Sequence, residues 1–188
     1  KIEGFYNYRP VQTGDVIPIP SGTLHALGPG IEVVEPQIPG PTQSLEDGAT
    51  YPVRYYFPGY ERAGAKKMLD IDRVNEITPA ETKTVSPEII EETEGYTIER
   101  LPGNFEDKGL EVHRITLETG RELEKKSITS FHNLVAVKGR ASVTIDNTSY
   151  EIPKAVPAGQ MLLIPCSAKG YKITASEKAQ IIDTFTPV

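Results

Sequence analysis

Short apolar runs separated by turn residues are the dominant pattern along this 188-residue chain. The runs are rich in Val, Ile, Tyr and Thr, and 16 Gly and 16 Pro interrupt them. Runs of this kind are typical of strands rather than helices. Many strands a turn apart predict an all-β fold, a jelly roll or a similar antiparallel sandwich. The predicted strands are 1–8, 16–20, 31–34, 53–57, 96–101, 110–117, 133–138, 141–146, 161–164, 171–174 and 180–185.

One segment has a helical period instead. In residues 65–77 apolar residues recur every three positions with Asp and Arg between them, which predicts a short amphipathic helix that ends at a Thr-Pro pair. The residues that follow, 78–94, are polar and acidic and contain two prolines, so we interpret them as a linker. A domain boundary is therefore expected near residue 86, dividing the chain into residues 1–85 and 86–188.

A short internal sequence repeat favours two related β-barrels. Residues 14–20 (GDVIPIP) return as residues 159–165 (GQMLLIP), each with a turn glycine, an apolar strand and a proline that ends it. Chance similarity of two short strands is the alternative. Five residues beyond the proline, the first copy has His25 and the second has Gly170. If the copies are equivalent, only the first barrel can hold a metal at this position.

Composition and charge narrow the function classes. The chain is 38% hydrophobic and 24% charged, which is ordinary for a globular protein. A net charge of −6 argues against a nucleic-acid or acidic-membrane partner, although it leaves room for a phosphorylated small molecule. The single cysteine, Cys166, excludes an intrachain disulfide framework and favours the reducing cytoplasm; we interpret it as a small core residue. Strand-like sequence begins almost at Lys1, so we expect an upstream segment to be missing from this chain.

The most specific string is residues 20–28 (PSGTLHALG). It predicts a tight turn that ends one strand and places His25 at the start of the next, where the ring could point into a barrel. A neutral imidazole is a good ligand for zinc and similar divalent ions. Taken alone, a histidine is more often a surface or core residue with a satisfied hydrogen bond.

The residues around His25 favour the metal-ligand interpretation over the structural one. The string closely resembles the Pro-[Ala/Ser]-Gly-Thr-x-His-Ala-[Ile/Leu]-Gly segment of type I mannose-6-phosphate isomerases, which belong to the cupin superfamily. Residues 30–37 (GIEVVEPQ) are similar to that family's Gly-Ile-x-x-x-Glu-x-Gln strand, and residues 51–56 (YPVRYY) resemble the place where it presents its active-site arginine. The resemblance implies the carboxy-terminal part of a bicupin. Residues 1–85 would hold the closing strands of a metal-site barrel with the helix and linker, and residues 86–188 a second cupin-like barrel without a metal site.

The resemblance also implies roles and an activity. His25 would be a metal ligand, Glu35 the proton-transfer group and Arg54 a contact for the transition state or the phosphate, while Arg62 and Lys66 are weaker candidates for binding the substrate. The family interconverts mannose 6-phosphate and fructose 6-phosphate with one divalent metal ion, zinc. Without the resemblance, the simpler interpretation is that Glu35 is a strand-edge carboxylate in water and that Arg54 forms a surface ion pair.

The family's other ligands, a Gln/His pair and a glutamate, precede the histidine motif. No histidine lies upstream of His25 in this sequence, so those ligands are expected on an upstream segment, and the chain alone is expected to be inactive. The expected partners are a sugar phosphate and that segment, with no nucleic acid and no membrane.

Two alternatives stay open. A non-catalytic sugar-binding or regulatory cupin is favoured by residues 38–52, a connection longer than is usual in the family, which could remodel a pocket. A purely structural partner domain fits the second barrel taken alone. His113 and His132 form no paired-ligand motif, and we interpret both as structural.

Overall fold

The computed structural model describes residues 8–19, 23, 25–37, 42–44, 50–52, 86–102, 109–155 and 159–187. Apart from a Cys166–Ala168 3-10 turn, the regular elements within these ranges are strands. No helix in these ranges has the length and apolar character needed to cross a bilayer. The strands are β1 (Thr42–Ser44), β2 (Thr50–Pro52), β3 (Glu88–Glu92), β4 (Tyr96–Arg100), β5 (Glu111–Leu117), β6 (Glu122–Lys126), β7 (His132–Lys138), β8 (Ala141–Ile145), β9 (Thr148–Glu151), β10 (Leu162–Ile164), β11 (Gly170–Ala175) and β12 (Ala179–Phe185).

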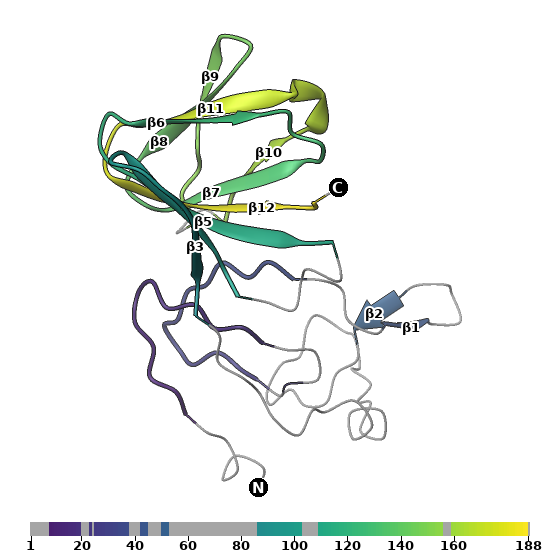
Figure 1. The fold of residues 1–188 in the computed structure, drawn as a ribbon. Coiled ribbons are helices and arrows are strands. Elements are labelled where there is room, and N and C mark those ends of the chain that lie inside the picture. Colours follow the sequence, from purple (N-terminus) through teal and green to yellow (C-terminus); the bar gives the residue numbers. More distant parts are fainter. Residues whose placement is uncertain are drawn as a thin grey trace, which may run out of the picture.

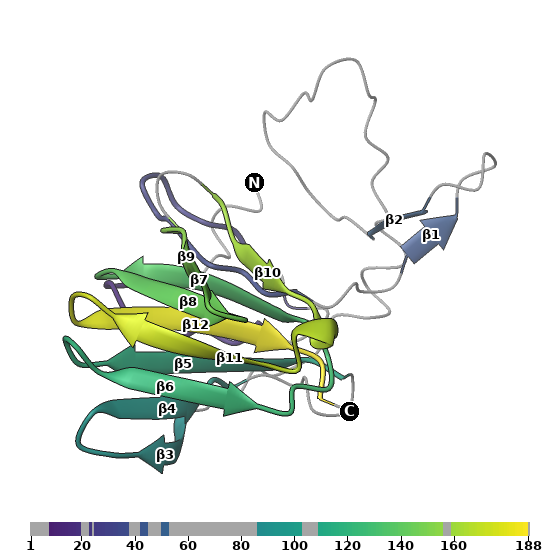
Figure 2. The same cartoon turned by 90° about the horizontal axis from the view of Figure 1, so that it is seen from above.

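Ten of these strands form two antiparallel sheets that face each other (Figures 1 and 2). The large sheet has the order β10-β7-β12-β5-β4-β3, and the small sheet has the order β6-β11-β8-β9. From β5 to β12 the chain changes sheet at every connection except the β8–β9 hairpin. Repeated crossing between two antiparallel sheets is the topology of a jelly roll. The predicted all-β cupin/jelly-roll class is therefore confirmed for residues 86–187.

The core lies between the two sheets because alternate residues of each strand point inward. In β5, Ile115 and Leu117 face this core and are fully buried, and Ile181 of β12 lies directly opposite Ile115. The small sheet contributes Val143 and Ile173, which are also fully buried and paired across β8 and β11. Burial of each such side chain stabilises the fold by about 1.5–3 kcal/mol, so the barrel has a substantial core.

The outer face of the large sheet is also covered. Val112, Val135 and Ile182 form a second apolar cluster there and are only 4–8% exposed. The strand register places Arg114 beside Ile182 on the same face. Residues 8–19 and 25–37 run along this side of the sheet, away from the small sheet (Figure 1). The fold thus has a third, irregular layer on the large sheet.

Seven predicted strands are confirmed within a residue or two at their ends: β4, β5, β7, β8, β10, β11 and β12. Two others are wrong in their described parts, because residues 16–19 and 31–34 are extended but pair with no neighbouring strand among the described residues. The linker prediction for residues 78–94 is wrong for Glu88–Glu92, which hydrogen bonds to β4 as the edge strand β3. Strand 53–57, the helix 65–77 and nearly all of strand 1–8 lie outside the described residues.

Cys166 is a further correction. We expected a small core residue at the end of a buried strand, and the structure exposes Cys166 instead. The strand β10 ends at Ile164, which is fully buried, and the chain then turns outward through Pro165 into the Cys166–Ala168 turn. The thiol therefore faces solvent rather than the apolar interior.

Candidate functional site

His25 lies on the extended segment that covers the large sheet, and its ring is exposed rather than directed into a barrel. Its Nδ1 atom is 2.8 Å from the carbonyl oxygen of Thr23. A carbonyl can only accept, so Nδ1 must carry the hydrogen, and in a neutral imidazole the lone pair then lies on Nε2. A metal-binding histidine commonly has this arrangement, with one ring nitrogen donating to a backbone carbonyl and the other free for the ion.

The other predicted site residues are placed only in part. Glu35 is exposed on the same extended segment as His25, and its carboxylate faces water. Arg54, Arg62 and Lys66 lie outside the described residues. The structure therefore places two of the five predicted site residues on one segment and leaves the grouping of all five a prediction.

A second group of polar residues, which the sequence did not indicate as a group, lies inside the barrel at one end. Asp183 of β12 is fully buried, and both of its carboxylate oxygens accept from Nδ1 of His132, at 2.9 and 3.0 Å. The hydroxyl of Tyr171, from the small sheet, donates to the same carboxylate at 3.2 Å. These three residues form one hydrogen-bonded network between the two sheets.

His113 and Phe185 complete this polar end of the barrel. The ring of Phe185 stacks on His132 with centroids 4.6 Å apart and meets His113 edge-on at 4.9 Å. Nε2 of His113 is 2.8 Å from a carboxylate oxygen of Glu111, so it acts as the donor. Nδ1 of His113 is buried and has no hydrogen-bond partner in the described structure.

Burial shifts the pKa values of His113 and Tyr171 at the polar end of the barrel. Burial lowers the pKa of His113 below its ordinary value, more than the hydrogen bond to Glu111 raises it, and the nearby Lys125 ammonium lowers it further. Burial and the charge of Asp183 raise the pKa of Tyr171 far above its ordinary value, so the phenol stays protonated and donates. The polar end is therefore built from a neutral phenol and a neutral His113 around a buried carboxylate.

The alternation of residues along two central strands is the sequence signal for this group. In β12 the inward positions after Ile181 are Asp183 and Phe185, while in β5 those before Ile115 are His113 and Glu111. Charged or polar residues at inward positions of otherwise apolar strands indicate a buried network. We predicted structural roles for His113 and His132, and their burial fits that interpretation.

The described residues provide only one of the ligands that a metal site needs. Within them, no group of three or more His, Cys, Asp or Glu side chains is arranged to hold a metal ion. His25 fits as one ligand because its Nε2 lone pair is available, and zinc takes about four donors. The polar end of the barrel offers no such set, because its two imidazoles are separated by the Phe185 ring.

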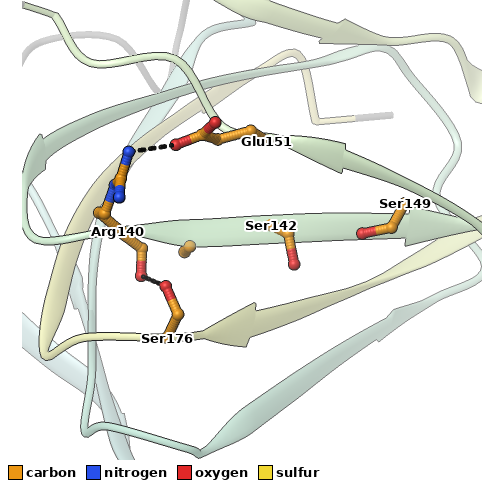
Figure 3. Close-up of a pocket in the computed structure, with 6 residues that line it drawn as sticks. Arg140, Ser142, Ser149, Glu151 and Ser176 are labelled. Carbon is orange, nitrogen blue, oxygen red and sulfur yellow. Dashed lines mark hydrogen bonds and ion pairs between the residues drawn. The ribbon is translucent and has the colours of Figure 1, made fainter.

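An open hollow of about 330 Å³ lies on the outer face of the small sheet. Figure 3 shows three serine hydroxyls, from Ser142, Ser149 and Ser176, around it, with Arg140 paired to Glu151 at 3.5 Å on its rim. The Ser176 hydroxyl donates to the Arg140 carbonyl. The hollow is polar and offers both donors and acceptors to a small ligand.

Parts of several solved structures are similar to about half of this chain. No protein-family model matches the sequence, and no curated protein matches it. Among solved structures, ectoine synthase from P. lautus is 14% identical, and the match covers 52% of this chain and 67% of that chain with a TM-score of 0.43. KdgF from Halomonas sp. is also 14% identical, covering 54% of this chain and 86% of that chain with a TM-score of 0.44.

A cupin_2 domain of an XRE-family transcriptional regulator from Enterobacter cloacae is 12% identical, covering 50% of this chain and 99% of that domain with a TM-score of 0.43. These likenesses concern the fold of about half of the chain. The names include enzymes as well as a domain of a regulator, and they describe those proteins.

Proposed function

We propose that this chain is the carboxy-terminal part of a metal-dependent aldose–ketose isomerase that interconverts mannose 6-phosphate and fructose 6-phosphate. The observation that carries the proposal is the hydrogen bond between His25 and the Thr23 carbonyl, within the residues whose sequence resembles that family. It fixes the tautomer that leaves Nε2 free and accessible. An exposed ring with one nitrogen held is suited to accept an ion that other residues help to bind.

The chain's own residues have separable tasks in this proposal. Isomerisation removes a proton from the carbon beside the carbonyl and returns it to the neighbouring carbon, through an enediolate. Glu35 accepts and returns that proton, a task suited to a positioned carboxylate. Arg54 stabilises the developing negative charge or binds the phosphate with its guanidinium group, and Arg62 and Lys66 contribute further positive charge near the phosphate.

A bound zinc ion would polarise the substrate oxygens beside the reacting carbons. His25 would hold it through Nε2, and the remaining donors would come from residues upstream of this chain. Because zinc takes about four donors, His25 alone cannot hold the ion, and the proposal requires those upstream residues.

The test uses the protein as it is encoded, with any upstream residues included. We expect His25→Ala to lower both the bound metal per chain and the turnover of mannose 6-phosphate. Glu35→Gln should leave the metal content intact and lower turnover by about 10²–10⁴, the usual contribution of a general base. Glu32→Gln, another exposed carboxylate on the same segment, is the matched control and should change neither quantity. Unchanged metal content in His25→Ala would remove the basis of the proposal.

The sugar-binding alternative has one observation in its favour. The hydroxyl-lined hollow of the small sheet presents the kinds of groups that hydrogen bond to sugar hydroxyls. If mannose 6-phosphate perturbs the NMR signals of Ser142 and Ser149 while no turnover is detected in the encoded protein, the binding function replaces the isomerase function.

A further inference from the structure

We infer that Arg114 of the second barrel is a positioning residue: its guanidinium group docks residues 8–37, the segment that carries His25, on the outer face of the large sheet. Its significance for metal binding rests on the proposed function, whereas the docking itself does not.

The contacts of Arg114 use three of its nitrogens. Nε and one terminal nitrogen pair with the two carboxylate oxygens of Glu99 on β4, at 2.6 and 2.8 Å. The other terminal nitrogen donates to the backbone carbonyl of Gly14 at 2.9 Å. Glu99 thereby fixes the plane of the guanidinium group, so that its remaining donor is aimed at the covering segment.

The acceptor lies in an ordered turn. The amide of Asp15 donates to the Gln12 carbonyl and the amide of Gln12 donates to the Asp15 carboxylate, both at 3.1 Å. Gly14 has a φ of +98°, a conformation that favours glycine and helps to direct its carbonyl toward Arg114. The turn opens the apolar run that leads directly into the histidine motif, so holding the turn limits where that motif can lie.

The pair that holds the Arg114 guanidinium group is partly buried, whereas its hydrogen bond to the Gly14 carbonyl is exposed. The Arg114 and Glu99 side chains are only 16% and 19% exposed. Arg114 lies beside the buried apolar cluster of Val112, Val135 and Ile182 on the same face of the sheet. Charged hydrogen bonds gain strength where water is partly excluded, which helps the Glu99 carboxylate to hold the guanidinium group in place. In the described part of the chain no strand pairing joins residues 8–19 or 25–37 to the barrel, so the hydrogen bond from Arg114 is a contact on which their docking can depend.

Hydrogen exchange of the encoded protein, followed by mass spectrometry, tests the docking. In Arg114→Ala, amides in residues 8–37 should exchange about tenfold faster or more, as expected for loss of a hydrogen bond to a charged group. Barrel peptides from residues 86–187 should keep their protection. Arg121→Ala is the matched control, because Arg121 pairs with Glu94 at 3.8 Å in an exposed loop. It should leave the exchange of residues 8–37 unchanged.

Two further variants keep the inference testable if Arg114→Ala does not fold. Arg114→Lys retains the charge but loses the two parallel hydrogen bonds to the Glu99 carboxylate that orient the donor, so the segment should exchange faster than in the wild type. Glu99→Gln should have a smaller effect in the same direction. Exchange of residues 8–37 that is equal in the wild type and in all folded Arg114 variants overturns the docking.

Zinc titration separates this inference from the proposed function. If both hold, Arg114→Ala weakens zinc binding at least several-fold while Arg121→Ala does not. If exchange changes as expected but the wild type binds no zinc, the isomerase proposal fails and the docking stands. If zinc binds equally to the wild type and to Arg114→Ala, Arg114 docks the segment without positioning His25, and the inference is overturned in that part.

Discussion

Replacing Asp183 by asparagine changes the charge of the buried network while keeping its volume. Asp183 has no exposed surface and accepts hydrogen bonds from His132 and Tyr171. A hydrogen bond to a charged group contributes about 1.5–3 kcal/mol, against about 0.5–1.5 kcal/mol between neutral groups. Loss of charge should therefore cost about 1 kcal/mol for each of the two partners. We expect Asp183→Asn to lower the free energy of unfolding by about 2 kcal/mol.

The magnitude is checked by urea unfolding at pH 7, followed by circular dichroism. For a barrel of this size the loss corresponds to a decrease in Tm of about 8–16 °C. Two further variants test the same network. Tyr171→Phe removes one hydrogen bond to the carboxylate and should cost about 1.5–3 kcal/mol. Asp183→Ala leaves both partners without an acceptor and should cost about 3–5 kcal/mol, close to the whole stability of a marginal domain.

The order of these three effects is the sharper test. If the network is structural, Asp183→Ala should lower the free energy of unfolding more than either Tyr171→Phe or Asp183→Asn. If Asp183→Asn changes the free energy of unfolding by less than about 0.5 kcal/mol, the carboxylate contributes no more than a neutral acceptor. The charged network would then not be what stabilises this end of the barrel.

Two other predictions concern single residues of the barrel. Gly139→Ala should lower the free energy of unfolding by at least about 2 kcal/mol in the same urea assay. The φ of Gly139 is +68°, and a Cβ there would lie 2.1 Å from the Lys178 carbonyl oxygen. Gly120 also has a positive φ but has open space around it, so Gly120→Ala is the control and should cost less. Because burial lowers the pKa of His113 below the unfolded value near 6.5, its contribution to stability is present above that pH and is lost on acidification, by at most about 1.4 kcal/mol per pH unit. His113→Leu should therefore flatten the decrease in Tm between pH 7.5 and 5.5, and an equal decrease in both proteins would contradict this.

The strands that the sequence failed to predict share a physical feature. Within the two facing sheets, β3 is an edge strand of the large sheet, and β6 and β9 are the two edges of the small sheet. An edge strand has one side open to water and often carries charged residues that discourage pairing with other chains. The runs EIIEE and ELEKK follow this rule and lack the apolar signature. Central strands such as β5 and β12 keep that signature because another strand pairs with each of their two edges and their inward residues are buried.

Only the contiguous part of the candidate site could be predicted from the sequence. The motif around His25 is contiguous, so local sequence was enough to single it out. The polar end of the barrel is assembled from residues as far apart as Glu111 and Asp183, and only the register of β5, β12 and β7 brings them together. Arg114 could not be anticipated either, because its partner Gly14 is separated from it by a hundred residues. Contacts between distant segments depend on topology, which a single sequence does not specify.

The environments of the three histidines explain why the proposed chemistry belongs to the extended segment and not to the barrel. A metal ligand needs a lone pair and access to the ion. His25 has both, since its Nδ1 hydrogen is held by the Thr23 carbonyl and its ring is exposed. His113 and His132 are 5% and 6% exposed, and their rings are separated by Phe185. In the described part of the chain the barrel contacts this segment through Arg114, whose guanidinium group donates to the Gly14 carbonyl.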